Sequence, residues 1–294
     1  MSDKLNFSPQ SLGRLASYSL LVLEGPDAVA FIQAQSMNDV NALGDGQWHW
    51  NGLLNPKGRL IALFALVRIR KDMLYVLSPD FPAEKLCLHL QRFVFRSKVR
   101  LTANPDSICF AELDSLPTTQ SSRDTISGSP ENGIALDFSS DTQSRRLVVL
   151  PIQHAENILP NPGIESAWRD ADIEHGLPRL SEAQSEQWTP QMLSLGNLHA
   201  FSLKKGCYPG QEIVARTHYL GQAKRQTFLV QSENLAMGAA IYAAGEKAGE
   251  VLCITSRSNM GLALISSTAE SGPMICGENE VKLLQALTGL QRPI

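Results

Sequence analysis

The stretch WHWNGLLNPKGRLIALFALVRI (residues 48–69) contains two apolar runs separated by a turn-forming tetrapeptide. The tetrapeptide, Asn55-Pro56-Lys57-Gly58, combines residue types that favour tight turns. The run before it, Trp48–Leu54, and the run after it, Arg59–Ile69, are rich in the aromatic, aliphatic and β-branched side chains of strands. We therefore predict two neighbouring strands joined by a tight turn, of which the second is long and apolar.

Signals on either side extend this stretch into a mixed αβ unit. We predict three further strands at Leu20–Leu23, Met73–Leu77 and Val99–Thr102, and two helices at residues 28–38 and 82–93. The first helix follows Gly25-Pro26-Asp27, where proline beside an acid is a start signal. The second places Leu86, Leu90 and Phe93 at helical spacing. The order β-α-β-β-β-α-β is the split βαβ pattern of ferredoxin-like layers.

The pattern weakens after residue 105 and changes again after Gly221. Between these points we predict an exposed loop over Asp114–Gly133, and strands and a helix at Ile108–Leu113, Ile134–Phe138, Arg146–Leu150 and Ser166–His175. Beyond Gly221, short strands between glycine-bearing turns indicate a small β-barrel: Thr227–Val230, Gly249–Thr255, Gly261–Ser266 and Glu280–Leu284. We expect an α+β protein with αβ domains at residues 1–105 and 106–221 and a β-barrel domain at 222–294.

Composition argues against several functional classes. The 294 residues carry a net charge of -3 and no long lysine or arginine run, so we expect no strong direct binding to nucleic acid. The five cysteines are scattered and the six histidines lack ligand spacing, so we predict neither a disulfide framework nor a metal site. The longest apolar stretch, Leu60–Val67, is far shorter than the ~20 residues of a membrane-spanning helix. We therefore expect a cytoplasmic protein that does not enter the membrane.

The run KKGCYPGQE (residues 204–212) carries the strongest chemical signal. Two glycines and a proline within five residues force a tight turn, and small residues let a ligand approach the backbone. The two lysines favour the thiolate of Cys207, and a helix expected from Gln211 through Arg216 would act in the same direction through its N-terminal dipole. Tyr208 offers a flat face and a hydroxyl, and Gln211 and Glu212 offer directional hydrogen bonds.

A plainer interpretation of the same run stays open. A lone cysteine is most often a small buried hydrophobe, so Cys207 alone does not indicate reactivity. A Gly-Pro-Gly cluster on its own usually marks only a turn.

The octapeptide from Lys205 to Glu212, with Arg216 following, resembles the hallmark of the YgfZ family. These are folate-binding proteins related to the aminomethyltransferase (T-protein) of the glycine cleavage system. Weaker blocks resemble other family segments: residues 23–28, 35–40, 55–59, 93–99 and 168–191. The octapeptide is very specific, and with the weaker blocks the resemblance spans Leu20 to Gly221.

The resemblance implies a three-domain ring around a central channel that holds tetrahydrofolate. It also implies support of iron–sulfur enzymes, including those that thiolate tRNA bases. Carried over by position, Trp168 and Tyr18 line the folate site, and the lysine, cysteine and tyrosine of the octapeptide (Lys205, Cys207 and Tyr208) form the functional loop. Two positions depart from the family pattern. Pro209 stands where a β-branched residue is common, and Tyr18 stands where relatives have a tryptophan.

A pterin is a flat heterocycle with polar groups along one edge, so its pocket needs an aromatic wall and a few aimed polar side chains. Trp168 is the candidate wall, and the candidates to bind the edge are Asn38, Asp39, Glu174 and Gln191. Candidate partners of the anionic glutamyl tail are Lys57, Arg59 and Arg216. Each also has an ordinary explanation, such as a core position for Trp168 or an exposed helix face for Glu174.

Three functions are compatible with these residues. The first is a monomeric accessory protein that binds a reduced folate and works with iron–sulfur proteins or their assembly factors. In such a protein the single motif cysteine cannot hold a cluster alone, because clusters usually take four protein ligands. The second is a folate-dependent aminomethyltransferase, which needs a carboxylate near the reactive nitrogens; residues 55–59 contain none, although Asp39 or Glu174 could substitute. The third is a direct tRNA binder, which the net charge disfavours. We favour the first.

Overall fold

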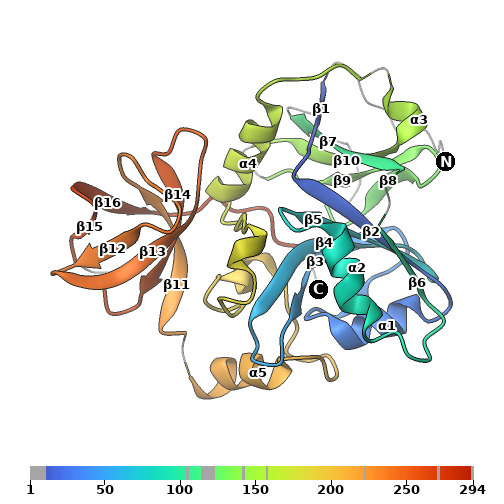
Figure 1. Cartoon of the computed structure of the whole chain (residues 1–294), viewed down its shortest axis with the longest axis horizontal. Coiled ribbons are helices and arrows are strands. Elements are labelled where there is room, and N and C mark those ends of the chain that lie inside the picture. Colours follow the sequence, from blue (N-terminus) through green and yellow to red (C-terminus); the bar gives the residue numbers. More distant parts are fainter. Residues whose placement is uncertain are drawn as a thin grey trace.

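The computed structural model describes residues 11–292 except for 104–105, 114–122, 141–142, 157, 222 and 270–271. The described residues form two five-stranded antiparallel sheets and a closed six-stranded barrel. Figure 1 shows the barrel on one side of the molecule and the two sheets on the other. This arrangement confirms the predicted fold class of αβ layers followed by a C-terminal β-barrel.

The first sheet is built around the stretch at residues 48–69. Its strand order is β3-β4-β5-β2-β6, with β2 at Tyr18–Glu24, β3 at Gln47–Leu54, β4 at Leu60–Arg70, β5 at Met73–Pro79 and β6 at Arg100–Ala103. Helices α1 (Ala28–Gln35) and α2 (Ala83–Gln91) pack on one face, where they meet alternate strand residues such as Leu21, Phe64 and Val76. Because strand side chains alternate between faces, the other face is left for a second core.

Two details of this unit differ from the prediction. Helix α1 ends at Gln35 rather than near Asn38, because Ser36 forms a β-bridge with Leu53 and the Met37 amide donates to the Gly52 carbonyl. Helix α2 ends at Gln91, and Phe93 lies beyond it with 40% of its surface exposed. Phe93 therefore does not belong to the buried helix face.

The second sheet has the order β1-β7-β10-β9-β8 and carries helices α3 and α4. Their bounds are β1 Leu12–Arg14, β7 Ser107–Leu113, β8 Ile126–Ser129, β9 Gly133–Asp137, β10 Arg145–Pro151, α3 Ile152–Ala155 and α4 Ile164–Glu174. Strand β1 pairs with β7 although residue 12 precedes the whole first sheet in sequence.

Strand β8 corrects the predicted loop over Asp114–Gly133. Its backbone pairs with β9 from Ile126 to Ser129, although the sequence Ile-Ser-Gly-Ser has little strand character. An edge strand of this kind is held by backbone hydrogen bonds to its neighbour, so its side chains carry little signal. Residues 114–122 of the predicted loop lie outside the described residues.

The inner faces of the two sheets share one core. Leu20, Val67 and Leu77 from the first sheet pack in the same cluster as Ala111 and Leu136 from the second. At one end of this core the rings of Trp48 and Phe138 stack with centroids 5.0 Å apart and planes 8° from parallel. Aromatic rings from both sheets therefore hold the two layers together.

The barrel closes in the order β11-β14-β13-β12-β15-β16. Its strands are β11 Arg225–Gln231, β12 Ala240–Ala243, β13 Glu246–Ile254, β14 Met260–Ser266, β15 Met274–Cys276 and β16 Asn279–Leu284. The short strands β12 and β15 were not predicted. Their side chains Ile241 and Met274 pack in the barrel's own core, with Val230 and Ile265.

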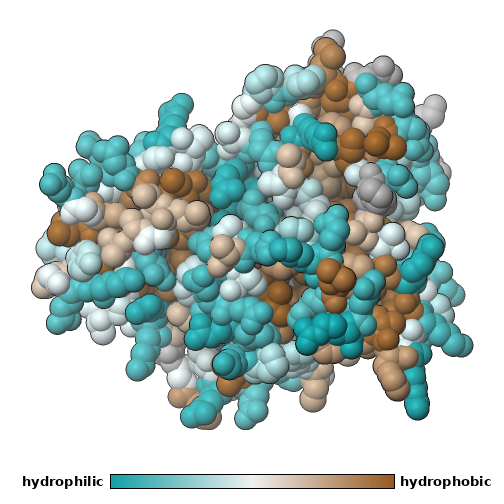
Figure 2. Space-filling view, viewed as in Figure 1, coloured by the Kyte–Doolittle hydropathy of each residue, from teal (hydrophilic) through white to brown (hydrophobic). Residues whose placement is uncertain are grey.

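The remaining elements lie in connecting segments. Three short 3-10 helices and one α-helix are η1 Val40–Ala42, η2 Glu182–Gln184, η3 Leu195–Leu198 and α5 Gln211–Leu220. Figure 2 shows hydrophilic and hydrophobic residues interspersed on the viewed face, with apolar side chains grouped over α2 and its connection to β6. Within the described ranges, none of the helices has the length and apolar character needed to span a membrane.

Candidate functional site

The motif loop (residues 203–210) lies against the turn at residues 55–58. Gly210 has a φ of 78°, and a Cβ there would lie 2.6 Å from the Asn55 oxygen. Gly58 has a φ of 70°, and a Cβ there would lie 2.7 Å from the Cβ of Ile213. Only glycine fits such close contacts with a left-handed backbone, so this pair lets the loop and the turn touch directly.

Lys205 anchors the loop to the end of α1. Its ammonium Nζ donates to the backbone oxygens of Gln33 at 2.6 Å, Ser36 at 2.5 Å and Asn38 at 3.0 Å. These carbonyls belong to the last turn of the helix and the residues after it, where unpaired oxygens favour a cation. The side chain is buried, and this burial lowers the pKa of Lys205 to about 8.

Tyr208 is the second anchor, and Cys207 lies between the two. The Tyr208 ring is buried, with the Lys205 ammonium 5.0 Å from its centroid. Burial raises the pKa of Tyr208 to about 12, and its hydroxyl has no hydrogen-bond partner among the described residues. Cys207, by contrast, is a free thiol exposed to solvent. The loop therefore presents one thiol outward while its neighbours on either side are fixed inside.

Several other predicted residues surround this loop. The Asn38 amide donates to the backbone oxygens of Trp50 at 2.9 Å and His199 at 2.7 Å. The Gln211 amide donates to the Lys205 oxygen at 3.3 Å, and the Gln191 amide to the Val214 oxygen at 2.8 Å. The Gln211 and Gln191 amides hold the loop and α5 in place, and the Asn38 amide joins β3 to the segment before the loop.

Glu212 and Arg216 lie on the exposed side of α5. The expected helix from Gln211 through Arg216 is confirmed, and it continues to Leu220. Both side chains are open to solvent, which suits a contact with a partner more than the wall of an internal pocket.

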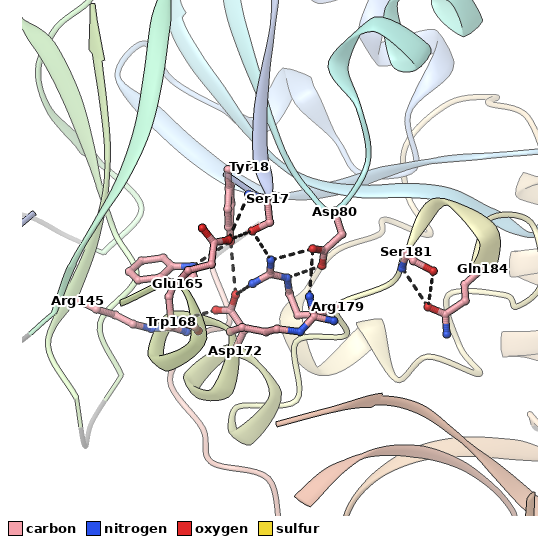
Figure 3. Close-up of polar contacts among 11 residues, drawn as sticks. Ser17, Tyr18, Asp80, Arg145, Glu165, Trp168, Asp172, Arg179, Ser181 and Gln184 are labelled. Carbon is pink, nitrogen blue, oxygen red and sulfur yellow. Dashed lines mark hydrogen bonds and ion pairs between the residues drawn. The ribbon is translucent and has the colours of Figure 1, made fainter. Parts of the chain in front are cut away.

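Trp168 and Tyr18 lie in a different place, between α4 and the start of β2. Trp168 is fully buried, and its indole Nε1 donates to the Tyr18 hydroxyl at 3.3 Å. The Tyr18 hydroxyl in turn lies 3.5 Å from a carboxylate oxygen of Asp172. Burial, with the nearby Asp172 charge, raises the pKa of Tyr18. Figure 3 shows these side chains converging from β2 and α4.

Asp172 is the centre of a buried charge network that the sequence did not reveal. Arg145 Nη1 donates to it at 2.6 Å and Arg179 Nη1 at 2.9 Å. Arg179 also pairs with Asp80, with Nε to Oδ2 at 2.6 Å. All three members of the central triad are at most 1% exposed. A signal was available, because Asp172 follows Trp168 by four residues and so shares its apolar helix face.

A cavity of about 550 Å³ lies between the end of α4, strand β11 and residues 283–291. Its lining combines apolar side chains such as Leu229 with the amides of Asn197 and Gln226. His175 also lines it, and its buried Nε2 has no partner in the described structure while its Nδ1 donates to the Ala171 oxygen at 2.6 Å. Burial lowers the pKa of His175, so Nε2 is an unshared acceptor.

Glu174 lies one residue before His175. It is partly buried, which raises the pKa of its carboxyl group, and the neighbouring Asp170 acts in the same direction. Among the described residues, no group of three or more histidine, cysteine, aspartate or glutamate side chains could hold a metal ion.

Comparison with known proteins places this geometry in context. The chain is 29% identical over 216 residues to an uncharacterized protein of Haemophilus influenzae, which covers 73% of this chain and 71% of that protein. It is 27% identical over 243 residues to the tRNA-modifying protein YgfZ of Yersinia pseudotuberculosis, covering 75% and 70%. The chain is a homologue of YgfZ. No family model matches the sequence.

The fold of this YgfZ homologue is that of the T-protein. The glycine cleavage system aminomethyltransferase T of Bartonella henselae superposes with a TM-score of 0.76 at 18% identity, covering 96% of this chain and 86% of that one. The predicted site residues of the YgfZ homologue form two groups. Lys205, Cys207 and Tyr208 meet Asn38 and α5 in one group, whereas Trp168, Tyr18 and Glu174 belong to α4 and its contacts with β2.

Proposed function

We propose that this protein binds tetrahydrofolate or another reduced folate and supports the assembly or repair of iron–sulfur enzymes, including enzymes that thiolate tRNA. The motif loop carries the proposal, because it exposes the Cys207 thiol between the buried anchors Lys205 and Tyr208. A thiol held outward on a fixed loop suits brief bonding to iron, sulfur or a partner's thiol.

The remaining cysteines support a shared rather than a resident cluster. Cys87, Cys109, Cys253 and Cys276 are all buried and free. Because a cluster usually takes four protein ligands, Cys207 would act together with ligands of a partner protein. The net charge of -3 favours an indirect effect on tRNA through such partners.

The two candidate places for a reduced folate differ in how well they fit it. The guanidinium of Arg145 lies 4.6 Å from the Trp168 ring centroid, so a pterin has no open ring face at fully buried Trp168 in this conformation. The cavity of about 550 Å³ fits better, because small-molecule sites are typically ~300–1,000 Å³, mostly apolar, with a few aimed polar groups. His175 Nε2 would accept a hydrogen bond from the ligand, and a bound reduced folate would supply a one-carbon unit or reducing equivalents.

The decisive experiment pairs binding with cellular function. Tetrahydrofolate is titrated anaerobically into the wild type, Cys207→Ser and the buried-cysteine control Cys276→Ser, and tRNA thiolation is measured in cells that depend on each variant. We expect Cys207→Ser to keep folate affinity and lose thiolation, with the control unchanged in both. Full thiolation with Cys207→Ser, or no binding of any reduced folate by the wild type, would contradict the proposal.

A folate-dependent aminomethyltransferase is the second candidate, because a T-protein fold here accompanies a partly buried Glu174 whose raised pKa suits proton transfer. The test is release of a one-carbon product from an aminomethyl donor. A transferase would release it and lose at least about tenfold in rate with Glu174→Gln. Absence of product with the wild type would leave the accessory role.

A further inference from the structure

The segment at residues 285–292, here called the return segment, runs from the barrel back between the two sheets. The Leu287 amide donates to the Glu174 oxygen at 2.8 Å, and the Leu290 oxygen accepts from the Trp50 indole at 2.8 Å. His199 Nδ1 donates to the Arg292 oxygen at 3.0 Å. Three separate parts of the molecule therefore hold this irregular segment.

Arg292 occupies an unusual position at the end of the return segment. It is fully buried, yet within the described residues its guanidinium donates only to backbone oxygens, including those of Gly289 at 3.0 Å and Asp137 at 2.6 Å. Its Nε has no partner among the described residues, and the guanidinium carbon lies 4.6 Å from the Trp48 ring centroid. Burial lowers the pKa of Arg292 to about 9. The described residues include no ion pair to this guanidinium, and the charges of Asp137 and Asp124 offset the effect of burial only in part. Such a buried cation is an expensive way to fill a core.

The groups around Arg292 suit a flat ligand that donates hydrogen bonds at its edge. Trp48 presents a flat face, and the Asp137 oxygen accepts from a planar N–C–N group at its edge. A 2-aminopyrimidinone ring, as in a pterin, carries the same planar N–C–N arrangement with outward N–H donors, but without the charge that makes burial costly. The site filled by Arg292 is therefore complementary to a neutral aminopyrimidinone.

The return segment also separates this site from the large cavity. Leu290 and Gln291 line the cavity, while Leu290 and Arg292 contact the two tryptophans of β3. Withdrawal of the segment would uncover the face of Trp48 on which Arg292 lies and would join it to the cavity. The joined space would take a ring at one end and a longer tail at the other.

We infer that Trp48 and the Asp137 oxygen form the pterin subsite of this protein, and that Arg292 is a tethered stand-in which a reduced folate must displace. This inference rests on the proposed folate binding and names the place and the regulation of that site. Because the ligand competes with the return segment, its apparent affinity equals the intrinsic affinity multiplied by the fraction of molecules in which the segment is open. A partner that captures the segment would raise folate affinity.

The test uses the full chain and needs no fragment. Amide hydrogen exchange of residues 285–292 is measured in the wild type with and without saturating pterin, tetrahydrofolate, guanosine or p-aminobenzoylglutamate. We expect pterin and tetrahydrofolate to accelerate exchange in this segment, and p-aminobenzoylglutamate, which lacks the ring, to leave it unchanged. Protection that persists while tetrahydrofolate binds would overturn the inference and leave the proposed function intact.

Variants give an independent measure of the competition. Arg292→Ala removes the stand-in and should tighten tetrahydrofolate binding about tenfold, since it deletes charge-assisted hydrogen bonds that close the segment. Arg257→Ala removes an exposed arginine of the barrel and should leave affinity unchanged. Equal or weaker binding by Arg292→Ala, or stronger binding of guanosine than of pterin, would refute the inference. Absence of binding by wild type and variants alike would refute the proposed function as well.

Discussion

Replacing Lys205 with methionine tests whether this residue fixes the motif loop. The change keeps an unbranched side chain, one atom shorter, but removes three hydrogen bonds to backbone oxygens. Hydrogen bonds from a charged donor contribute about 1.5–3 kcal/mol each. Against this, the burial that lowers the pKa from 10.5 to about 8 corresponds to about 3 kcal/mol of cost to the charged form. The balance predicts a loss of about 1.5–6 kcal/mol in the free energy of unfolding.

Two measurements check this prediction. Urea denaturation gives the free energy of unfolding, and the alkylation rate of Cys207 in the folded protein reports on the loop. We expect Lys205→Met to unfold at lower urea and to change the alkylation rate. The matched control is Lys204→Met, because Lys204 is the adjacent lysine and is exposed. If Lys205→Met were as stable as Lys204→Met and its thiol reacted at the same rate, the anchoring role would be wrong.

Three further predictions concern buried groups. His49 is buried, which lowers its pKa from 6.5 to about 3, so only the unfolded chain binds a proton at this residue between these values. The free energy of unfolding should therefore fall by about 1.4 kcal/mol per pH unit from about pH 6 to 4. His49→Gln should remove this slope in acid denaturation curves. Asp172→Asn leaves two buried arginines short of a counter-charge and should lower the free energy of unfolding by about 3–5 kcal/mol, whereas an unchanged urea midpoint would show that the network contributes little. Gly210→Ala should separate the loop from the facing turn and lower the melting temperature, while Gly206→Ala, with open space around it, should change it little.

The first sheet was predictable because its local signals agree with its tertiary contacts. The turn at residues 55–58 and the apolar run after it specify β3 and β4 without knowledge of their partners. Strands β8, β12 and β15 were missed because each is only three or four residues long and is held by backbone pairing with neighbouring strands. Pairing, rather than side-chain pattern, makes them strands.

In the candidate site, too, the sequence predicted the local features but not the contacts between separate segments. The motif predicted an unusual loop, and the exposure of Cys207 rules out the plainer interpretation of a buried hydrophobe. The sequence could not show that Lys205 points its ammonium at the end of α1, because these contacts join residues 167 to 172 positions apart. The triad at Asp172 and the stacking of Arg292 on Trp48 are likewise encounters between distant segments. The position of Asp172 on an apolar helix face signals its burial, but no local pattern identifies the arginines with which it pairs.

The return segment also has a consequence for how the chain is made. The hydrogen bond between Trp50 and Leu290 joins residues 240 positions apart, so it cannot form during synthesis until residues near 290 have left the ribosome. Both sheets have all their strands by residue 151, well before that moment. Closure of so long a loop comes late and is slow compared with local folding. A nascent chain therefore spends part of its synthesis with both sheets formed and one face of Trp48 uncovered, which gives a ligand an opportunity to bind before its competitor exists.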